Sequence, residues 1–256
     1  EIRVHDTASA DDDYITWAPT GCTIRVRPDS GVTEDLKVVL TNDPPQDEGK
    51  DGDLKFALTV QAVKTADKDQ ITLTLKKDGA PEKFFIAGKF DHPSSKDKDA
   101  IIQAHKDTAD GAIVGTHALM VRVRKNASKL SKDERDAFLD AIEMVKASAG
   151  YKELVDMHTV ATGSPTIHAQ AHRDAGFLPW HRAFLLQYER ELQKIHPHVA
   201  LHYWREDEQS KIFTPDFMGR NAVSATNPFQ LVDVELNSDN PLFNWKIEGV
   251  SLHRSS

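Results

Sequence analysis

The period of the hydrophobic pattern changes once along this chain, and that change constrains the fold more than any other feature. Up to about residue 95, apolar and polar residues alternate in short runs, such as 22–27, 54–60 and 71–75. Alternation of this kind is typical of half-buried strands, and turn-forming Pro, Gly, Asn and Asp residues separate the runs. After residue 130, apolar residues instead recur at every third or fourth position, which is typical of one face of a helix. The sequence therefore predicts strands first and helices afterwards.

A polar, proline-containing segment at 92–99 lies between the two patterns and predicts a domain boundary. We expect an α+β, multi-domain chain. Residues 1–95 are predicted to form an all-β sandwich or barrel, and residues 96–256 a helical domain. The first domain is expected to be structural or to dock a partner, because His5 and His92 have no companion there that would make a site.

Three helices are expected in the second domain, and two of them carry a histidine on their apolar face. The first begins with the capping-box pattern of residues 131–134 and ends near Gly150. The second follows at once and places His158 among its inward apolar residues. The third has Pro179 in its first turn, and His181 lies in its apolar stripe.

Composition argues against several classes of protein. The chain has 32 Lys and Arg against 40 Asp and Glu, a formal charge of −8 that is spread along the sequence. This argues against a nucleic-acid partner and against a polybasic membrane module. No apolar run approaches the roughly 18 residues of a membrane span. The single cysteine, Cys22, rules out an internal disulfide and a cysteine-rich zinc site. Because the chain begins at Glu1 and not at Met, we expect that an upstream segment has been removed, and export is slightly favoured.

Most of the twelve histidines lie in the C-terminal half, which directs attention there for chemistry. His172 lies in the segment leading into the third helix, so it could converge with His158 and His181 on one metal ion. Three neutral imidazoles without a thiolate suit copper or zinc. His168 precedes His172 by four residues and competes for the same role, and spacing alone does not choose between them. Taken singly, a buried histidine is more often a hydrogen-bonded core residue.

Residues 172–192 resemble the first copper-binding signature (CuA) of tyrosinases, catechol oxidases and molluscan-type haemocyanins. The segment reads HRDAGFLPWHRAFLLQYEREL. The flanking segments are similar to the stretch that carries the first ligand in that family and to the region after CuA: they are 123–138, 151–158, 199–204 and 213–219. The resemblance covers roughly residues 115–230.

The resemblance implies a tyrosinase-like helical bundle whose CuA ligands are His158, His172 and His181. It also implies that Phe177 and Trp180 pack around these ligands and that His168 is not one of them. Some relatives join a cysteine to the middle ligand. Here Cys22 lies far outside the motif, as is typical of bacterial members of the family.

The implied activity is that of a polyphenol oxidase, either a monophenol monooxygenase or a catechol oxidase. Such an enzyme oxidises mono- or ortho-diphenols to o-quinones with O2, and no catalytic residue beyond the metal ligands is expected on this chain. Haemocyanin-like O2 binding and an inactive single-copper module are the alternatives.

Type-3 copper chemistry needs two coppers, each held by three histidines, and no second site (CuB) is recognisable in this sequence. After Gly219 only His253 remains. His196, His198 and His202 are the other candidates for a second metal-binding cluster. However, Pro197 and the apolar run that follows indicate an ordinary turn and an extended segment. We therefore expect one copper on this chain. A second polypeptide or proteolytic fragment is expected to carry CuB and the other copper.

Overall fold

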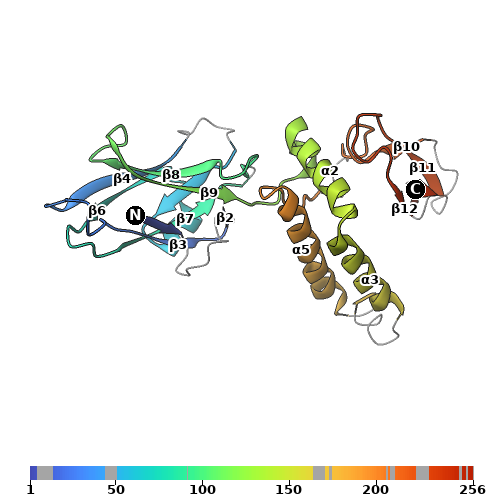
Figure 1. Cartoon of the computed structure of the whole chain (residues 1–256), viewed down its shortest axis with the longest axis horizontal. Coiled ribbons are helices and arrows are strands. Elements are labelled where there is room, and N and C mark those ends of the chain that lie inside the picture. Colours follow the sequence, from blue (N-terminus) through green and yellow to red (C-terminus); the bar gives the residue numbers. More distant parts are fainter. Residues whose placement is uncertain are drawn as a thin grey trace. The chain divides into compact units, whose positions relative to one another are not determined.

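The structure, a computed structural model, describes residues 1–4, 14–43, 51–90, 92–163, 171–172, 175–205, 207, 211–222, 231–247, 250–251 and 253–255. The chain divides into two compact units, residues 1–125 and 126–256. Sheets dominate the first unit and helices the second, so the predicted α+β class is confirmed (Figure 1).

The first unit is built from two sheets. A four-stranded sheet has the order β1 (Ile2–Val4), β3 (Thr20–Ile24), β7 (Glu82–Gly88), β5 (Leu54–Ala57). A five-stranded sheet has the order β2 (Tyr14–Ile15), β9 (Ile113–Val121), β8 (Ala100–Lys106), β4 (Leu36–Asp43), β6 (Gln70–Leu75). The short helix α1 (Val60–Thr65) follows β5. Buried side chains of both sheets belong to one hydrophobic core, which makes the unit a sandwich.

Strand β6 shows why these residues form strands. Ile71, Leu73 and Leu75 are buried, whereas Thr72 and Thr74 between them are exposed. Successive side chains of a strand point to opposite faces, so this alternation places every apolar residue of β6 in the core. The period-two pattern predicted from the sequence is therefore the pattern of burial.

The division between the two units lies later than the predicted boundary, which corrects the ranges 1–95 and 96–256. Strands β8 and β9 follow residue 95, yet β8 pairs with β4 in the larger sheet of the first unit. The polar segment 92–99 is a connection within the sandwich: the Ser94 amide donates to the Val121 carbonyl (2.8 Å), and the Val121 amide donates to Ser94 Oγ (2.8 Å). Polar composition alone does not distinguish such a connection from a linker.

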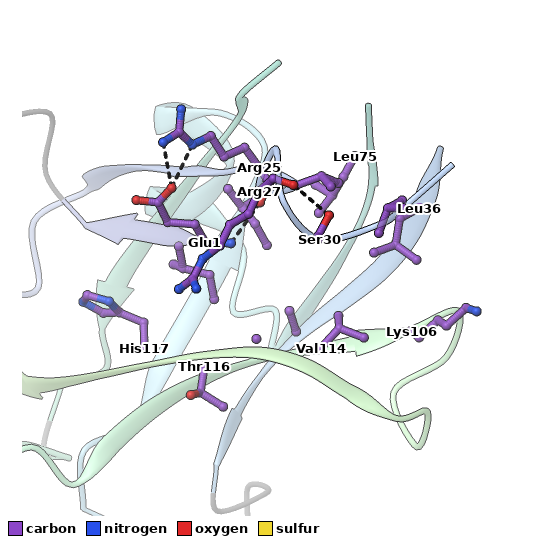
Figure 2. A pocket seen from close by; sticks show the side chains of 16 residues that line it. Glu1, Arg25, Arg27, Ser30, Leu36, Leu75, Lys106, Val114, Thr116 and His117 are labelled. Carbon is purple, nitrogen blue, oxygen red and sulfur yellow. Dashed lines mark hydrogen bonds and ion pairs between the residues drawn. The ribbon is translucent and has the colours of Figure 1, made fainter. Parts of the chain in front are cut away.

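A cavity of about 810 Å³ in the first unit is lined by residues of both sheets (Figure 2). Its walls include Ile24 from the smaller sheet and Leu36, Leu75 and Ala104 from the larger one. The cavity is therefore continuous with the apolar core between the sheets.

In the part of the second unit that the structure describes, three long helices come first. They are α2 (Lys132–Lys146), α3 (Ala149–Gly163) and α5 (Phe177–Ile195), which agree with the three predicted helices. The predicted capping box begins α2: the Glu134 amide donates to Ser131 Oγ (3.2 Å), and the Ser131 amide donates to a Glu134 carboxylate oxygen (2.7 Å). Among the described residues, no helix has the length and apolar character needed to cross a membrane.

Short strands follow the helices. β10 (Arg220–Asn221), β11 (Leu231–Glu235) and β14 (His253–Ser255) form one small sheet, and β12 (Lys246–Ile247) pairs with β13 (Val250–Ser251).

The core of the second unit holds α5 against α2. Leu139 of α2 and Leu192 of α5 are fully buried in one apolar cluster, which Val199 and Phe217 from the following segments complete. Glu189 is buried on the same helix and accepts a hydrogen bond from the Leu201 amide (2.7 Å). These contacts fix α5, and with it the side chains of its first turns.

Candidate metal centre

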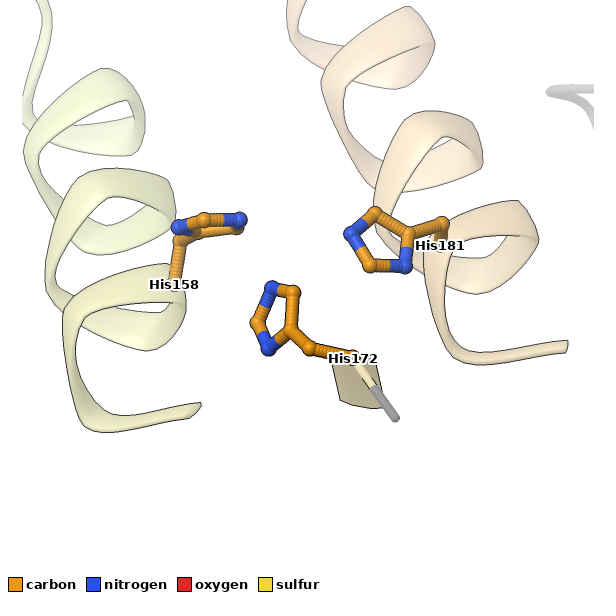
Figure 3. Close-up of side chains that lie close together, drawn as sticks. All are labelled: His158, His172 and His181. Atoms are coloured by element: carbon orange, nitrogen blue, oxygen red, sulfur yellow. The ribbon is translucent and has the colours of Figure 1, made fainter. Parts of the chain in front are cut away.

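Three histidine side chains come together in the second unit. His158 lies on α3, His181 lies on α5, and His172 precedes α5 in the sequence. One potential ligand nitrogen of each lies within 4.8 Å of the other two, and Figure 3 shows the three rings facing one another. The ring centroids are 5.2, 5.1 and 6.1 Å apart, and all three side chains are half-buried.

Helix geometry selects the tautomer of His181. Its Nδ1 lies 3.0 Å from the carbonyl oxygen of Phe177, one helical turn earlier. Because a carbonyl oxygen can only accept, Nδ1 carries the proton and donates it. In the neutral imidazole Nε2 then keeps its lone pair, which is the arrangement of a metal-ligating histidine whose other nitrogen is held by a backbone carbonyl.

Aromatic side chains pack against the histidines. The Trp180 ring lies 5.8 Å from that of His158, 6.0 Å from that of His172 and 4.9 Å from that of His181. Phe184 stacks on Trp180 at 5.3 Å and also contacts His158 at 5.6 Å. These rings limit the rotation of the imidazoles and keep water from one side of the group.

The donor set fits copper. Three imidazole nitrogens converge, and neither a carboxylate nor a thiolate belongs to the group, so a hard cation such as Mg²⁺ or Ca²⁺ lacks its preferred ligands. Metal–imidazole bonds are about 2 Å long, so nitrogens within 4.8 Å of one another reach one ion after small side-chain adjustments. Imidazoles suit zinc as well as copper, so the donor set alone does not choose between these two metals.

The other histidines singled out from the sequence have different surroundings. His196 Nε2 lies 2.7 Å from an Asp140 carboxylate oxygen, and the ring of His202 packs edge-on against Phe138 at 4.8 Å. In the part of the chain that the structure describes, no second group of three potential metal ligands is present. His168 lies outside the described residues.

Two contributors to the site went unrecognised in the sequence. Phe184 follows Trp180 by four residues and therefore lies on the same face of α5, but apolar spacing alone does not distinguish a residue of the site from one of the core. The Phe177 carbonyl, which orients His181, is a backbone group four residues earlier, and only the helical register reveals it.

Large apolar side chains on α3 and α5 remain exposed. Val160 is 59% and Leu178 75% exposed, and the others with high exposure on these two helices are Val155, Met157, Phe177, Leu185 and Leu186. A shallow cavity of about 490 Å³ between the two helices is lined by Met157, Val160 and Trp180 among others. So much apolar surface on two neighbouring helices is typical of a face that another protein covers.

Comparison with known proteins finds similarity over the part of the chain that carries this site. The model of the common central domain of tyrosinase matches residues 148–255. The tyrosinase of Streptomyces glaucescens is 38% identical over 103 residues, which are 38% of each chain. The tyrosinase of Streptomyces lincolnensis is 36% identical over 119 residues, 42% of this chain and 43% of the relative.

The grixazone synthase of Streptomyces griseus is 34% identical over 111 residues, 40% of this chain and 36% of the relative. The chain thus spans less than half the length of these three relatives. All three histidines of the candidate metal centre lie inside the matched domain. Over this matched part the chain is similar to the tyrosinase family, and in particular to its bacterial members.

Proposed function

We propose that this chain is the CuA-bearing part of a type-3 copper oxidase that oxidises mono- or ortho-diphenols to o-quinones with O2. The observation that carries the proposal is the convergence of His158, His172 and His181, a copper-compatible donor set, inside a tyrosinase domain. The electron balance depends on the phenol. Each of two diphenols gives up two electrons and two protons, and O2 takes up these four electrons and four protons to become two waters. With a monophenol, one oxygen atom of O2 enters the ring and the other leaves as water.

In this proposal the three histidines hold one copper ion, which supplies the capacity to activate O2 together with a second copper. The chain's own contribution is to position the ligands. The Phe177 carbonyl keeps the proton of His181 on Nδ1, and the rings of Trp180 and Phe184 hold the imidazoles in place and exclude water. No side chain is required as nucleophile or base.

The second copper site, CuB, is proposed to come from another polypeptide or fragment. Two observations support this part of the proposal. Among the described residues there is one three-histidine group and no other. In addition, α3 and α5, which carry His158 and His181, expose Val160 and Leu178 to solvent. A partner that places its own histidines opposite this group would also cover these apolar side chains.

The test is native mass spectrometry of the purified particle, with copper quantified and O2 uptake with catechol measured in the same sample. We expect a second chain and two coppers per complex, with O2 consumed as quinone forms. His172→Ala should abolish O2 uptake, whereas His92→Asn, a half-buried histidine of the first unit, should leave it unchanged. A lone chain with one copper or none, and no O2 uptake, would contradict the proposal. Reversible O2 binding without quinone formation would identify a carrier instead.

A further inference from the structure

A second, smaller cavity of the first unit lies outside the matched tyrosinase domain and plays no part in the proposed oxidase chemistry. It is lined by residues between Thr41 and Ile113, whereas the family match begins at residue 148. Its volume of about 540 Å³ is within the range of cavities that take small organic ligands. Unlike the larger cavity, it is lined mainly by polar side chains, so hydrogen bonding decides what it can hold.

Strand register places three of these polar side chains in one row. Thr41 of β4 pairs with Gln70 of β6 on one side and with Gln103 of β8 on the other, and all three line the cavity. Side chains of directly paired residues share one face of a sheet, with Cβ atoms about 4.5–5.5 Å apart. Leu40 and Ile71, the next residues along β4 and β6, lie in the core between the sheets. The row therefore lies on the outer face of the five-stranded sheet.

The buried His105 determines what Thr41 can offer to a ligand. His105, which is 9% exposed, has its Nδ1 3.0 Å from the Gly111 carbonyl oxygen and its Nε2 3.1 Å from Thr41 Oγ1. Because a carbonyl oxygen only accepts, Nδ1 donates, and in the neutral imidazole Nε2 accepts the hydroxyl proton of Thr41. Thr41 Oγ1 then presents only lone pairs to the cavity, so it is an acceptor there.

The other polar side chains add further acceptors. Gln103 Nε2 donates to an Asp43 carboxylate oxygen (2.7 Å), which fixes the amide and leaves its carbonyl oxygen as an acceptor. Gln70 and Asp110 are exposed, and neither side chain is hydrogen-bonded or ion-paired with another described residue. No lysine or arginine is among the described residues that line this cavity. Its polar surface therefore favours a ligand that brings hydrogen-bond donors.

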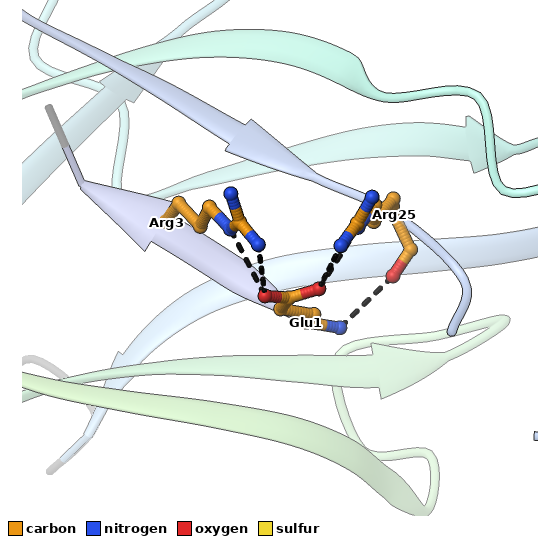
Figure 4. A network of polar contacts seen from close by, with 3 residues as sticks. All are labelled: Glu1, Arg3 and Arg25. Atoms are coloured by element: carbon orange, nitrogen blue, oxygen red, sulfur yellow. Dashed lines mark hydrogen bonds and ion pairs between the residues drawn. The ribbon is translucent and has the colours of Figure 1, made fainter. Parts of the chain in front are cut away.

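The two cavities of the first unit differ in how their carboxylates are engaged. In the larger cavity, Glu1 is the one lining carboxylate, and its two oxygens accept from Arg3 Nε (2.9 Å) and Arg25 Nε (2.8 Å) (Figure 4). In the smaller cavity, Asp69 is paired with Lys89 Nζ (2.7 Å). The carboxylate of Asp110 is the one that remains for a ligand, so a single negative charge is left uncompensated there.

We propose that this cavity binds a neutral saccharide. Sugar hydroxyls donate to Thr41 Oγ1, to the Gln103 carbonyl and to the Asp110 carboxylate, and the Gln70 amide both donates and accepts. A ligand with few donors would leave these acceptors unsatisfied, which is unfavourable once water is displaced. Ile113, which lines the cavity and is 53% exposed, offers an apolar contact to the C–H groups of a sugar ring. An anion would be repelled by Asp110.

The test is an NMR titration of the whole chain that follows backbone and glutamine side-chain amides. Cellobiose and maltose are the neutral probes, spermidine is a cation without hydroxyls, and glucuronate is an anionic sugar. We expect at least one disaccharide to bind roughly tenfold or more tightly than spermidine and glucuronate, because several hydrogen bonds depend on its hydroxyls. The shifts should centre on Gln70, Gln103 and Ile113.

Substitutions test whether binding occurs at the row. Gln70→Ala and Thr41→Val should each weaken disaccharide binding about fivefold or more, the usual effect of one lost hydrogen bond. Gln70 is exposed, so its variant should fold even if Thr41→Val, which also removes the bond to His105, is destabilised. Gln61→Ala, on α1 and away from the cavity lining, is the matched control and should bind as the parent chain does.

Three results would overturn the proposal. They are no binding of either disaccharide, tighter binding of spermidine than of both disaccharides, and unchanged disaccharide binding in Gln70→Ala. None of these results depends on copper or on oxidase activity.

Discussion

At the scale of single residues, copper binding depends on the positions of the imidazoles of His158, His172 and His181. Replacing His172 by Ala removes one of three donors, and the remaining pair on α3 and α5 should hold copper at least about 100-fold more weakly, since loss of even an outer partner of a ligand costs 10–100-fold. Copper titration followed by equilibrium dialysis measures this. The fold should persist, because His172 is only half-buried, and circular dichroism provides the control. Unchanged copper affinity would mean that the three histidines do not form the site.

The buried Tyr188 side chain should make the stability of the second unit depend on pH at high pH. Burial raises the pKa of Tyr188 to about 12, and the nearby Tyr151 contributes in the same direction. An unfolded tyrosine titrates near pH 10, so between about pH 10 and 12 the unfolded chain releases a proton that the folded chain keeps. Stability from this group is thus complete below pH 10 and falls as the pH rises through that window, by about 2–3 kcal/mol in total.

Urea unfolding of the second unit from pH 9 to 12 tests this expectation. Tyr188→Phe should lose less stability above pH 10 than the parent chain does. Tyr203→Phe, which changes an exposed tyrosine, should follow the parent chain. Parallel curves for all three proteins would show that Tyr188 ionises as easily in the folded chain as in the unfolded one.

Sequence reasoning at this scale succeeded where a side chain lies on a regular helix. His158 and His181 could be placed on apolar faces by spacing alone, because a helix fixes which residues share a face. Spacing alone does not choose between His172 and His168, and only the family resemblance favours His172. The tautomer of His181 depends on a backbone carbonyl and could not be inferred from residue types.

At the scale of elements, the start of α2 depends on two reciprocal hydrogen bonds between Ser131 and Glu134. Ser131→Ala leaves the first-turn amide of Glu134 without its side-chain acceptor and should cost about 1 kcal/mol of the stability of the second unit. The midpoint of urea unfolding measures the change. Ser128→Ala alters an exposed serine just before the helix and should have little effect. Equal effects of the two substitutions would argue against the cap.

Helix α5 depends on its buried C-terminal half for its position. Leu192→Ala empties a fully buried site in the cluster shared with α2 and should destabilise the second unit by about 2–5 kcal/mol. Leu186→Ala on the same helix truncates a side chain that is 42% exposed and should cost much less. Chemical unfolding of both variants gives the comparison, and similar losses would mean that α5 is not anchored by this cluster.

The elements themselves were predictable and their grouping was not. The capping box and the period-two burial of β6 are local, so residues within a few positions determine them. The pairing of β4 with β8 joins residues about 60 positions apart, so the local sequence pattern does not predict it. For this reason the segment 92–99 was interpreted as a boundary, although it connects two parts of one sandwich.

At the scale of the whole molecule, both units expose some large apolar side chains, Leu58 of the first unit among them. In the second unit such side chains gather on α3 and α5, the two helices that carry His158 and His181. A surface of this kind is costly for a protein that stays alone, because the exposed groups favour association or aggregation. A partner that carries CuB, as proposed above, would cover these side chains.

Substitutions on the exposed faces of α3 and α5 test whether partner binding can be lost while copper binding is kept. In Val160→Glu and Leu178→Glu, a charge replaces an exposed apolar side chain on α3 or α5, while the three histidines are untouched. Because burying an unpaired carboxylate is unfavourable, each variant should bind the second chain at least about tenfold more weakly and lose O2 uptake, yet still bind one copper. Leu58→Glu changes an equally exposed apolar residue of the first unit and should retain both chains and activity. If the α3 and α5 variants keep the second chain and full O2 uptake, the partner does not cover these side chains, and a different surface must meet it.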